Sequence, residues 1–282
     1  TLFRSVSYTY ADSKVIIDGV GDQPGSAWKA LVSQRGTNNK ELGYASYVMP
    51  HRIVANVSYA KDYAKYFGSQ ISLSYYGGPR GRANIDYVSN VFGDGAYNYS
   101  LIDIPTYKDL YGDKGWGTGN WTFKDQTDKE GNITYSAAEQ CEDFWSYIQS
   151  NDYLKSHTGS VNERNAVVSP WVHTFDLKFN QNFYFYTGAK HKKHTVQLGV
   201  DVENFANLLS PYWGNVYSIN AGDGYGNAIP VNLTNAKAVY TTGAKPVFQY
   251  QKNGSDRLTD LYSVSNGFSS TWQIIFNLRY IF

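Results

Sequence analysis

Two groups of side chains have the types and spacing that metal binding or acid–base chemistry requires. His191 and His194 form an H-x-x-H pair, and imidazole nitrogens at this spacing can hold zinc. No carboxylate or third ligand follows nearby in the sequence, so we interpret the pair as part of a solvated basic turn. Asp201 and Glu203 resemble a carboxylate pair for general acid–base catalysis. On an extended strand both would simply share one polar face.

Motifs for other enzyme chemistry are missing from the sequence. It contains no G-x-S-x-G, no P-loop and no dinucleotide fingerprint. The GDGYG at 222–226 is Gly-rich but lacks the strand and helix that would give it meaning. We therefore predict a protein that is not an enzyme and that uses no cofactor and no metal.

A third group of side chains is suited to binding rather than to catalysis. Five aromatic residues surround the Gly-rich stretch GDKGWGTGN: Tyr107, Tyr111, Trp116, Trp121 and Phe123. The stretch looks too flexible and too polar to form a core of its own. Exposed rings on such a loop can contact sugar faces or peptide side chains. Packing of the rings onto neighbouring loops explains them equally well, and both interpretations stay open.

The elements that position these residues are indicated by alternation with period two. In the last eleven residues, 272–282, one parity reads Trp, Ile, Phe, Leu, Tyr, Phe and the other reads Gln, Ile, Asn, Arg, Ile. A tilted strand of about 9–11 residues crosses a bilayer, and aromatics at both ends of an apolar stripe are typical of its interfaces. A strand of a soluble sandwich would also alternate. Longer segments at 171–185 and 195–205 repeat the pattern.

Coarsely, the sequence predicts eight strands, near 3–13, 42–60, 68–88, 170–186, 195–207, 213–220, 245–252 and 268–282. The turns near 61–67 and 187–193 are short, whereas the connections at 14–41, 89–168, 207–213 and 253–267 are long. This asymmetry is typical of outer-membrane barrels. The connection at 221–244 is long where the alternation requires a short turn. Inside 89–168, Ser136 and Glu139 form a capping box, followed by a helical apolar stripe at Ala137, Cys141, Phe144, Trp145 and Ile148.

Composition excludes some classes of protein. Hydrophobic residues make up 42% of the chain, and no apolar run approaches the length of a membrane helix. A strand barrel escapes such averages because its lipid-facing residues alternate with polar ones. The 25 basic and 24 acidic residues leave a net charge of +1 without a basic block, so nucleic acid is not expected as a partner. Cys141 is the single cysteine and forms no internal disulfide. The first residues, TLFRSVSYTY, already read as a strand, so we expect either that a signal and an upstream part precede them or that the chain is a mature fragment.

Three stretches carry a resemblance to a known family. NERNAVVSPWVHTFDLKFNQNF, HTVQLGVDVENFANLLSPYWG and the terminal WQIIFNLRYIF resemble the C-terminal barrel of TonB-dependent outer-membrane transporters, of the Oar-like and SusC-like kinds. The resemblance implies a barrel of about 22 strands around a plug. It also implies energising by a TonB-type protein through a region absent here, and a possible lipoprotein lid at the cell surface. The plug and the early strands are not recognisable, so residues 1–282 correspond to the C-terminal part only.

The first hypothesis is therefore an all-β, transmembrane antiparallel barrel in the outer membrane of a Gram-negative bacterium, which contacts membrane lipids and transports nutrients. One parity forms the lumen wall: Asp176, Lys178, Asn180, Asn182, Gln197, Asp201, Glu203, Asn277 and Arg279. A wall of mixed sign suits neutral or zwitterionic cargo, such as an oligosaccharide or a peptide. The other parity faces lipid: Phe175, Leu177, Phe179, Val196, Leu198, Val200, Phe276 and Leu278. Trp272, Phe276, Tyr280 and Phe282 are expected to act as the assembly signal.

Two rival hypotheses remain at this stage. A small closed barrel of eight strands could serve as a surface adhesin or binding protein, with an interior just filled by side chains. A soluble β-sandwich with a recognition loop would explain the alternation without a membrane.

Overall fold

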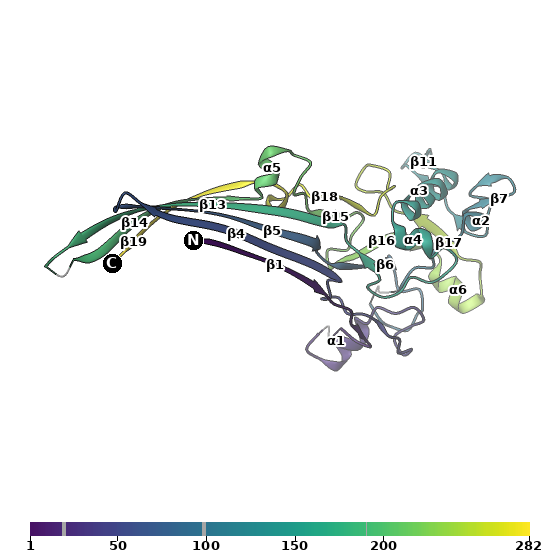
Figure 1. Cartoon of the computed structure of the whole chain (residues 1–282). Coiled ribbons are helices and arrows are strands. Elements are labelled where there is room, and N and C mark those ends of the chain that lie inside the picture. Colours follow the sequence, from purple (N-terminus) through teal and green to yellow (C-terminus); the bar gives the residue numbers. More distant parts are fainter. Residues whose placement is uncertain (19–20, 98–99, 190) are drawn as a thin grey trace.

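The computed structural model describes residues 1–18, 21–97, 100–189 and 191–282. The chain is mostly β, with 44% of its residues in strands and 16% in helices. It consists of a long antiparallel sheet and a folded region built from the connections between the strands of that sheet (Figure 1).

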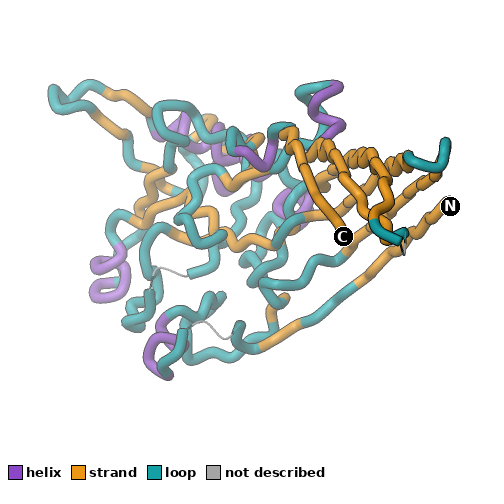
Figure 2. The backbone as a smooth tube through the Cα atoms, turned by 90° about the vertical axis from the view of Figure 1, so that its left-hand side faces the viewer, coloured by secondary structure: helices purple, strands orange, loops and turns teal. Residues whose placement is uncertain are grey.

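The long sheet has six strands in the order β1-β4-β5-β13-β14-β19. Their bounds are β1 Leu2–Tyr10, β4 His51–Tyr63, β5 Phe67–Pro79, β13 Trp171–Thr187, β14 Lys192–Glu203 and β19 Gln273–Ile281. Every neighbouring pair is antiparallel, and the sheet curves as a long arch. β1 and β19 lie at its two edges and do not pair with each other, so the arch is open (Figure 2). The expectation of a small closed barrel of eight strands is therefore wrong for the described residues.

Two of the eight predicted strands do not belong to this sheet. The segment at 213–220 contains only β15 (Tyr217–Ile219), which pairs with β18 (Tyr262–Val264), and the segment at 245–252 contains β17 (Val247–Tyr250), which joins another sheet. The segment at 68–88 divides after Pro79, since β6 (Arg82–Tyr87) leaves the long sheet. Pro79 has no N–H to donate to a ladder, which makes it a natural end of the pairing.

The connections are sorted by length between the two ends of the sheet. At one end, short turns join β4 to β5 and β13 to β14, as the sequence predicts. At the other end lie the three long connections 11–50, 80–170 and 204–272. The odd long connection predicted at 221–244 thus disappears, because 204–272 is one connection between β14 and β19.

The long connections fold together into a compact region, which we call the loop domain (residues 11–50, 80–170 and 204–272). Its sheet has the order β12-β6-β16-β17-β9, with β12 Val167–Val168, β16 Asn227–Leu233 and β9 Thr122–Phe123. Its helices are α1 Pro24–Lys29, α2 Tyr107–Leu110, α3 Ala137–Gln149, α4 Asp152–Ser156, α5 Phe205–Leu209 and α6 Ala236–Thr242, with a 3-10 turn η1 at Phe268–Ser270. Short hairpins complete it: β2 Lys14–Val15 with β3 Gly43–Tyr44, β7 Tyr111–Gly112 with β8 Gly115–Trp116, and β10 Gln126–Thr127 with β11 Ile133–Tyr135.

The hydrophobic core lies in the loop domain, not between sheet layers. Phe144, Tyr147 and Ile148 of α3 pack with Tyr250 of β17 and Ile85 of β6, all of them nearly inaccessible to solvent. The capping box predicted for α3 is present, because Ser136 and Glu139 each accept the other residue's backbone N–H. Leu110 and Phe123, on either side of the Gly-rich stretch, are buried in this core, which is built with residues of α3 and β17.

The first long connection is tied to the second by polar contacts. The Arg164 guanidinium donates to the carbonyls of Val15 and Ile16. The Asn165 side-chain amide donates to Asp18 Oδ2 at 2.8 Å and to the Tyr44 carbonyl at 2.7 Å. These bonds hold the first and second long connections together at the end of the long sheet.

The register of the long sheet sorts its side chains into two unlike faces. Residues that pair across strands share a face, and one such row contains Val57, Leu73, Leu177, Val202 and Ile274. The adjacent rows of the other face contain Asn56 with Ser74, and Lys178 with Asp201. We call the face with the Val57 row the apolar face and the face with the Lys178 row the polar face.

Aromatic rings border the apolar face at both ends. At the loop-domain end, His51 stacks near Tyr8 and Trp171, and Tyr75 near His173 and Phe175. At the short-turn end, the rings are Tyr63, Phe67, Phe183, Phe185, His194, Tyr280 and Phe282. Between these two aromatic belts most side chains are aliphatic or aromatic, and the polar ones include Arg4, Lys61, Ser69 and Gln181.

Among the described residues, no helix is long and apolar enough to cross a membrane.

Candidate functional site

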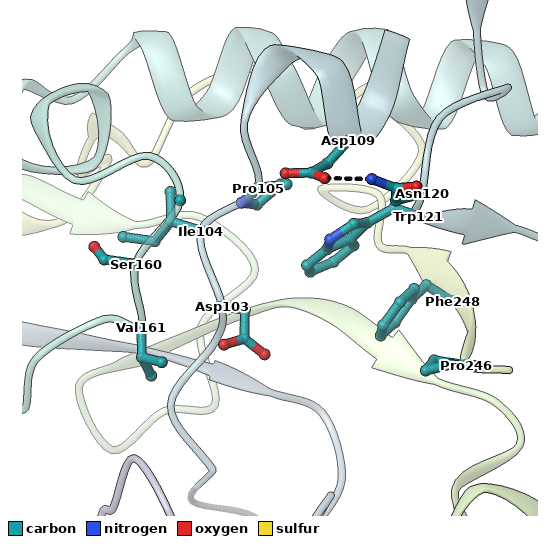
Figure 3. Close-up of a pocket in the computed structure, with 11 residues that line it drawn as sticks. Asp103, Ile104, Pro105, Asp109, Asn120, Trp121, Ser160, Val161, Pro246 and Phe248 are labelled. Atoms are coloured by element: carbon teal, nitrogen blue, oxygen red, sulfur yellow. Dashed lines mark hydrogen bonds between the residues drawn. The ribbon is translucent and has the colours of Figure 1, made fainter. Parts of the chain in front are cut away.

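The loop domain contains a pocket of about 430 Å³, in which an aromatic wall meets four polar side chains (Figure 3). Its lining is Asp103, Ile104, Pro105, Asp109, Asn120, Trp121, Gly159, Ser160, Val161, Pro246 and Phe248. These residues come from the second and third long connections. The pocket's volume lies within the range of small-molecule sites, which span about 300–1,000 Å³.

Trp121 forms the aromatic wall. Its ring stacks on Phe248, with centroids 4.4 Å apart and an interplanar angle of 21°, and Phe144 of α3 supports it from behind at 5.7 Å. Phe123 packs against Phe248 at 6.0 Å and is buried. The indole is thus held in one orientation, with its edge and part of its face toward the cavity (Figure 3).

Asp109 and Asn120 form the polar rim beside the indole. Thr106 caps α2, and Asp109 Oδ2 accepts the Thr106 N–H at 2.8 Å and its hydroxyl at 2.7 Å. Asp109 Oδ1 accepts from the Asn120 side-chain amide at 3.0 Å. Burial raises the pKa of Asp109, but the hydrogen bonds from Thr106 and Asn120 outweigh it, so the pKa is lowered overall. The carboxylate stays charged and orients Asn120.

Asp103 lies on the opposite side of the pocket, and its pKa shifts the other way. Burial raises the pKa of Asp103, although the Tyr87 hydroxyl donates to its Oδ2 at 3.1 Å and opposes the rise. Two carboxyls with opposite shifts can form an acid–base pair. Here both oxygens of Asp109 are already bonded by Thr106 and Asn120, so Asp109 acts as a helix cap and a rim, not as a base.

The five aromatic residues that the sequence singles out separate into two places. Trp121 lines the pocket, and Phe123 lies buried behind it. Tyr107, Tyr111 and Trp116 form a second cluster around α2, with ring centroids 5.0 to 5.4 Å apart. Tyr107 also meets Trp145 of α3 edge-on at 5.4 Å. Packing onto neighbouring elements therefore accounts for much of this set, while Trp121 keeps a role at the cavity.

Sequence reasoning missed the other pocket residues. Phe248 lies about 130 residues after Trp121, in a segment that reads as a barrel strand, and no local pattern connects the two. Asp103, Asn120 and Ser160 are single polar residues in loops. The only local signal is T-x-x-D at Thr106 and Asp109, which is a capping box with Thr at the N-cap and Asp at the N3 position of the helix.

The nine residues predicted as a lumen wall all lie in the strands of the long sheet and on its polar face. Lys178 donates to Asp201 Oδ2 at 2.9 Å, and Asn277 donates to the same oxygen at 2.9 Å. Gln197 donates to Asn182 Oδ1 at 2.8 Å, and Asp176 accepts the Asn204 N–H at 2.8 Å. The structure thus brings Asp201, Lys178 and Asn277 together across three strands.

The structure does not assemble an acid–base pair from Asp201 and Glu203 or a metal site at His191 and His194. Asp201 is paired with Lys178, so it does not form an acid–base pair with Glu203. His194 bonds the Tyr280 hydroxyl at 2.6 Å and the Thr187 hydroxyl at 2.7 Å. Lys190, in the same turn, lies outside the described residues. Within the described part of the chain, no group of three His, Cys, Asp or Glu side chains is placed to hold a metal ion.

The aromatic residues expected to signal assembly lie at the C-terminal edge of the sheet. Phe276, Tyr280 and Phe282 belong to the apolar face, with Tyr280 stacked on Phe282 at 5.7 Å. Trp272 comes just before β19. Phe276 is 79% exposed and Phe282 is 77% exposed, so no described part of the chain covers these two rings.

Comparison of the chain with protein-family models, with curated proteins and with solved structures finds no match in any of the three. The resemblance to TonB-dependent transporters stays a prediction from the sequence.

Proposed function

We propose that this chain forms part of the wall of an outer-membrane β-barrel transport protein, of the TonB-dependent type, in a Gram-negative bacterium. The observation that carries the proposal is the long sheet, whose apolar face is bordered by two aromatic belts and is largely uncovered, with α5 lying over β13 near the loop-domain end. A soluble sandwich would bury that face against a second sheet. Phe276 and Leu278 are instead 79% and 76% exposed.

The spacing of the belts supports a membrane position. On β13 the belts lie at His173 and Phe183, about ten residues or ~33 Å apart along the strand. A strand tilt of about 40° reduces this to about 25 Å along the membrane normal, which equals the apolar band of outer-membrane barrels. The apolar side chains between the belts then face lipid.

The polar face and the open edges support a large barrel rather than a small one. In an eight-strand barrel, interior side chains fill the lumen and must satisfy one another. On this polar face Lys178, Glu203 and Arg279 remain exposed although their strands are paired. Side chains of this kind suit a water-filled lumen, and β1 and β19 would pair with further strands of the same wall.

The loop domain gives such a barrel a place to capture cargo. All long connections lie at one end of the sheet, which corresponds to the outer end in barrels of this class. The pocket at Trp121 offers an aromatic wall, a charged carboxylate and an amide, a combination that suits an oligosaccharide or a peptide. Energising by a TonB-type protein, and a lipoprotein lid over the loop domain, complete the proposal as partners.

Cysteine labelling of neighbouring residues on β14 tests the membrane position. Cys141 is buried and its pKa is raised to about 12 by burial, so the native thiol will react slowly. We expect Leu198→Cys to react with a lipid-soluble maleimide and to resist a charged one in outer-membrane vesicles. Gln197→Cys, one residue away on the polar face, should show the reverse preference. Equal labelling of both cysteines by the charged reagent would refute a lipid-facing surface.

A surface-binding protein without transport is the second candidate, and the folded loop domain with its own core favours it. Uptake separates the two. Cells that produce the full protein should accumulate a fluorescent oligosaccharide or oligopeptide, and the accumulation should stop when the proton gradient is dissipated. Binding at the surface without accumulation would favour the adhesin.

A further inference from the structure

The connection after β14 folds back over the apolar face of the sheet. Here α5 (Phe205–Leu209) lies on the convex side of the arch, above β13 (Figure 1). A cavity of about 290 Å³ remains between the two layers. Its walls are Trp171, His173 and Phe175 of β13 with Ala206, Tyr212 and Trp213 of the connection.

The roof of the cavity is fixed in place by backbone-directed side chains. The Asn204 amide donates to the Gly214 carbonyl at 3.0 Å, and the Asn207 amide donates to the Trp213 carbonyl at 2.8 Å. Gly214 has φ +67°, and a Cβ there would clash with the Asn204 side chain. The shape of the roof therefore exists before any ligand arrives.

The interior of the cavity is suited to an apolar ligand. His173 Nδ1 is bonded to the Tyr75 hydroxyl at 2.8 Å, and the imidazole ring adds stacking surface to the wall. Aromatic rings supply most of the remaining wall. Outside the cavity, Leu209 is 64% exposed and extends the apolar surface beside it, and Tyr212 of the cavity wall is itself 85% exposed.

We propose that this cavity binds the acyl chain of a lipid from the leaflet at the loop-domain end of the sheet. The proposal rests on the proposed function, because it needs the apolar face to contact a membrane. The occupant follows from position: the cavity lies at the aromatic belt and opens on the same apolar face, so a lipid chain is the ligand that this surface meets. A bound chain would fix the height of the loop domain above the bilayer.

Filling the cavity tests the proposal. Ala206 lines it, so Ala206→Phe places a ring inside, while Leu209→Phe adds the same ring outside as the matched control. Native mass spectrometry of the full protein, extracted in mild detergent, should find lipid retained by the unchanged protein and by Leu209→Phe. A ring that displaces about two chain methylenes should lower retention in Ala206→Phe about tenfold.

The mass of the retained molecule identifies its source, and either lipopolysaccharide or phospholipid supports an acyl chain as occupant. Absence of retained lipid, or equal retention in Ala206→Phe and Leu209→Phe, overturns the proposal.

A second measurement separates this failure from failure of the proposed function. In vesicles of phosphatidylcholine with brominated chains, the quenching attributable to Trp272 is the difference between the unchanged protein and Trp272→Phe. Trp272 does not line the cavity, so its quenching reports membrane contact and not occupation of the cavity. If Trp272 is quenched and Trp213, measured in the same way, is not, the lipid site is wrong and the barrel wall stands. If neither is quenched, the proposed function fails first.

Discussion

A lysine placed at three depths on β14 and β19 tests the apolar face most directly. Val200 lies in one row with Phe179 and Phe276. That row is about four residues from the belt at Phe183 and about six from the belt at His173, or roughly 10 Å and 15 Å along the membrane normal. Val200 is therefore near mid-membrane, where a Lys costs about 2–4 kcal/mol.

Lys at the two other positions should show how the cost falls from mid-membrane to the interface. Tyr280 lies in the belt, where Lys costs about 0–1 kcal/mol, and Leu198 lies between the two positions. Gln197→Lys is the matched control on the polar face, because its ammonium can replace the amide that donates to Asn182. Folding of the full protein into lipid vesicles, followed by urea titration, measures each free energy of unfolding. A cost at Val200 no larger than at Gln197, or no change from Tyr280 to Val200, would refute the barrel wall.

Three further predictions concern the edge strand, the pocket and a buried acid. Deleting Phe282 should lower the amount of folded protein in the outer membrane while synthesis stays unchanged; normal assembly would leave Phe282 as only the last residue of a strand. Trp121→Ala should destabilise the loop domain by about 3 kcal/mol because it removes the ring stacked on Phe248, whereas Trp121→Phe should keep the fold and weaken cargo binding; unchanged binding of a fluorescent oligosaccharide would place capture elsewhere. Asp86 is buried without a hydrogen-bond partner, and burial followed by repulsion from Asp223 raises its pKa. Its folded pKa exceeds its unfolded pKa, so its contribution to stability is present at low pH and is lost as the pH rises through the folded pKa. Asp86→Asn should thus raise stability by about 1–3 kcal/mol at pH 8 and progressively less toward acid; a constant difference from pH 5 to pH 8 in urea unfolding would contradict this cause.

Period-two alternation predicted the long strands well, for a physical reason. On β13 and β14 both faces have a strong preference, so a slip of one residue would exchange Leu177 with Lys178. The two short turns, between β4 and β5 and between β13 and β14, were predictable for the same reason, because the alternation breaks for only a few residues at each. The capping box at Ser136 also acts locally, and the helix that it predicts is present.

The loop domain could not be predicted, because its contacts join distant parts of the chain. The segments at 213–220 and 245–252 alternate as barrel strands do, yet β17 pairs with β16 and β9 to cover α3. Short apolar alternations look alike whether the partner is lipid or a core. The Gly-rich stretch near Trp116 gained a core only because Phe248 and α3 arrive from elsewhere.

The long sheet exposes its apolar side chains, whereas the loop domain buries them. In the long sheet Phe276 and Leu278 point away from the protein, whereas in the loop domain Phe144 and Tyr250 point into it. An average over such a chain carries little information, which is why a mean hydropathy of −0.46 accompanies an uncovered apolar face. The boundary between the two parts coincides with Pro79 and Pro170, which have no N–H to continue the pairing of β5 and β13. Beyond it the backbone of Arg80 bonds the Ser169 hydroxyl at 2.9 Å instead of a strand. Under the proposed function, the surroundings of the protein would change from lipid to water at the level of these two prolines.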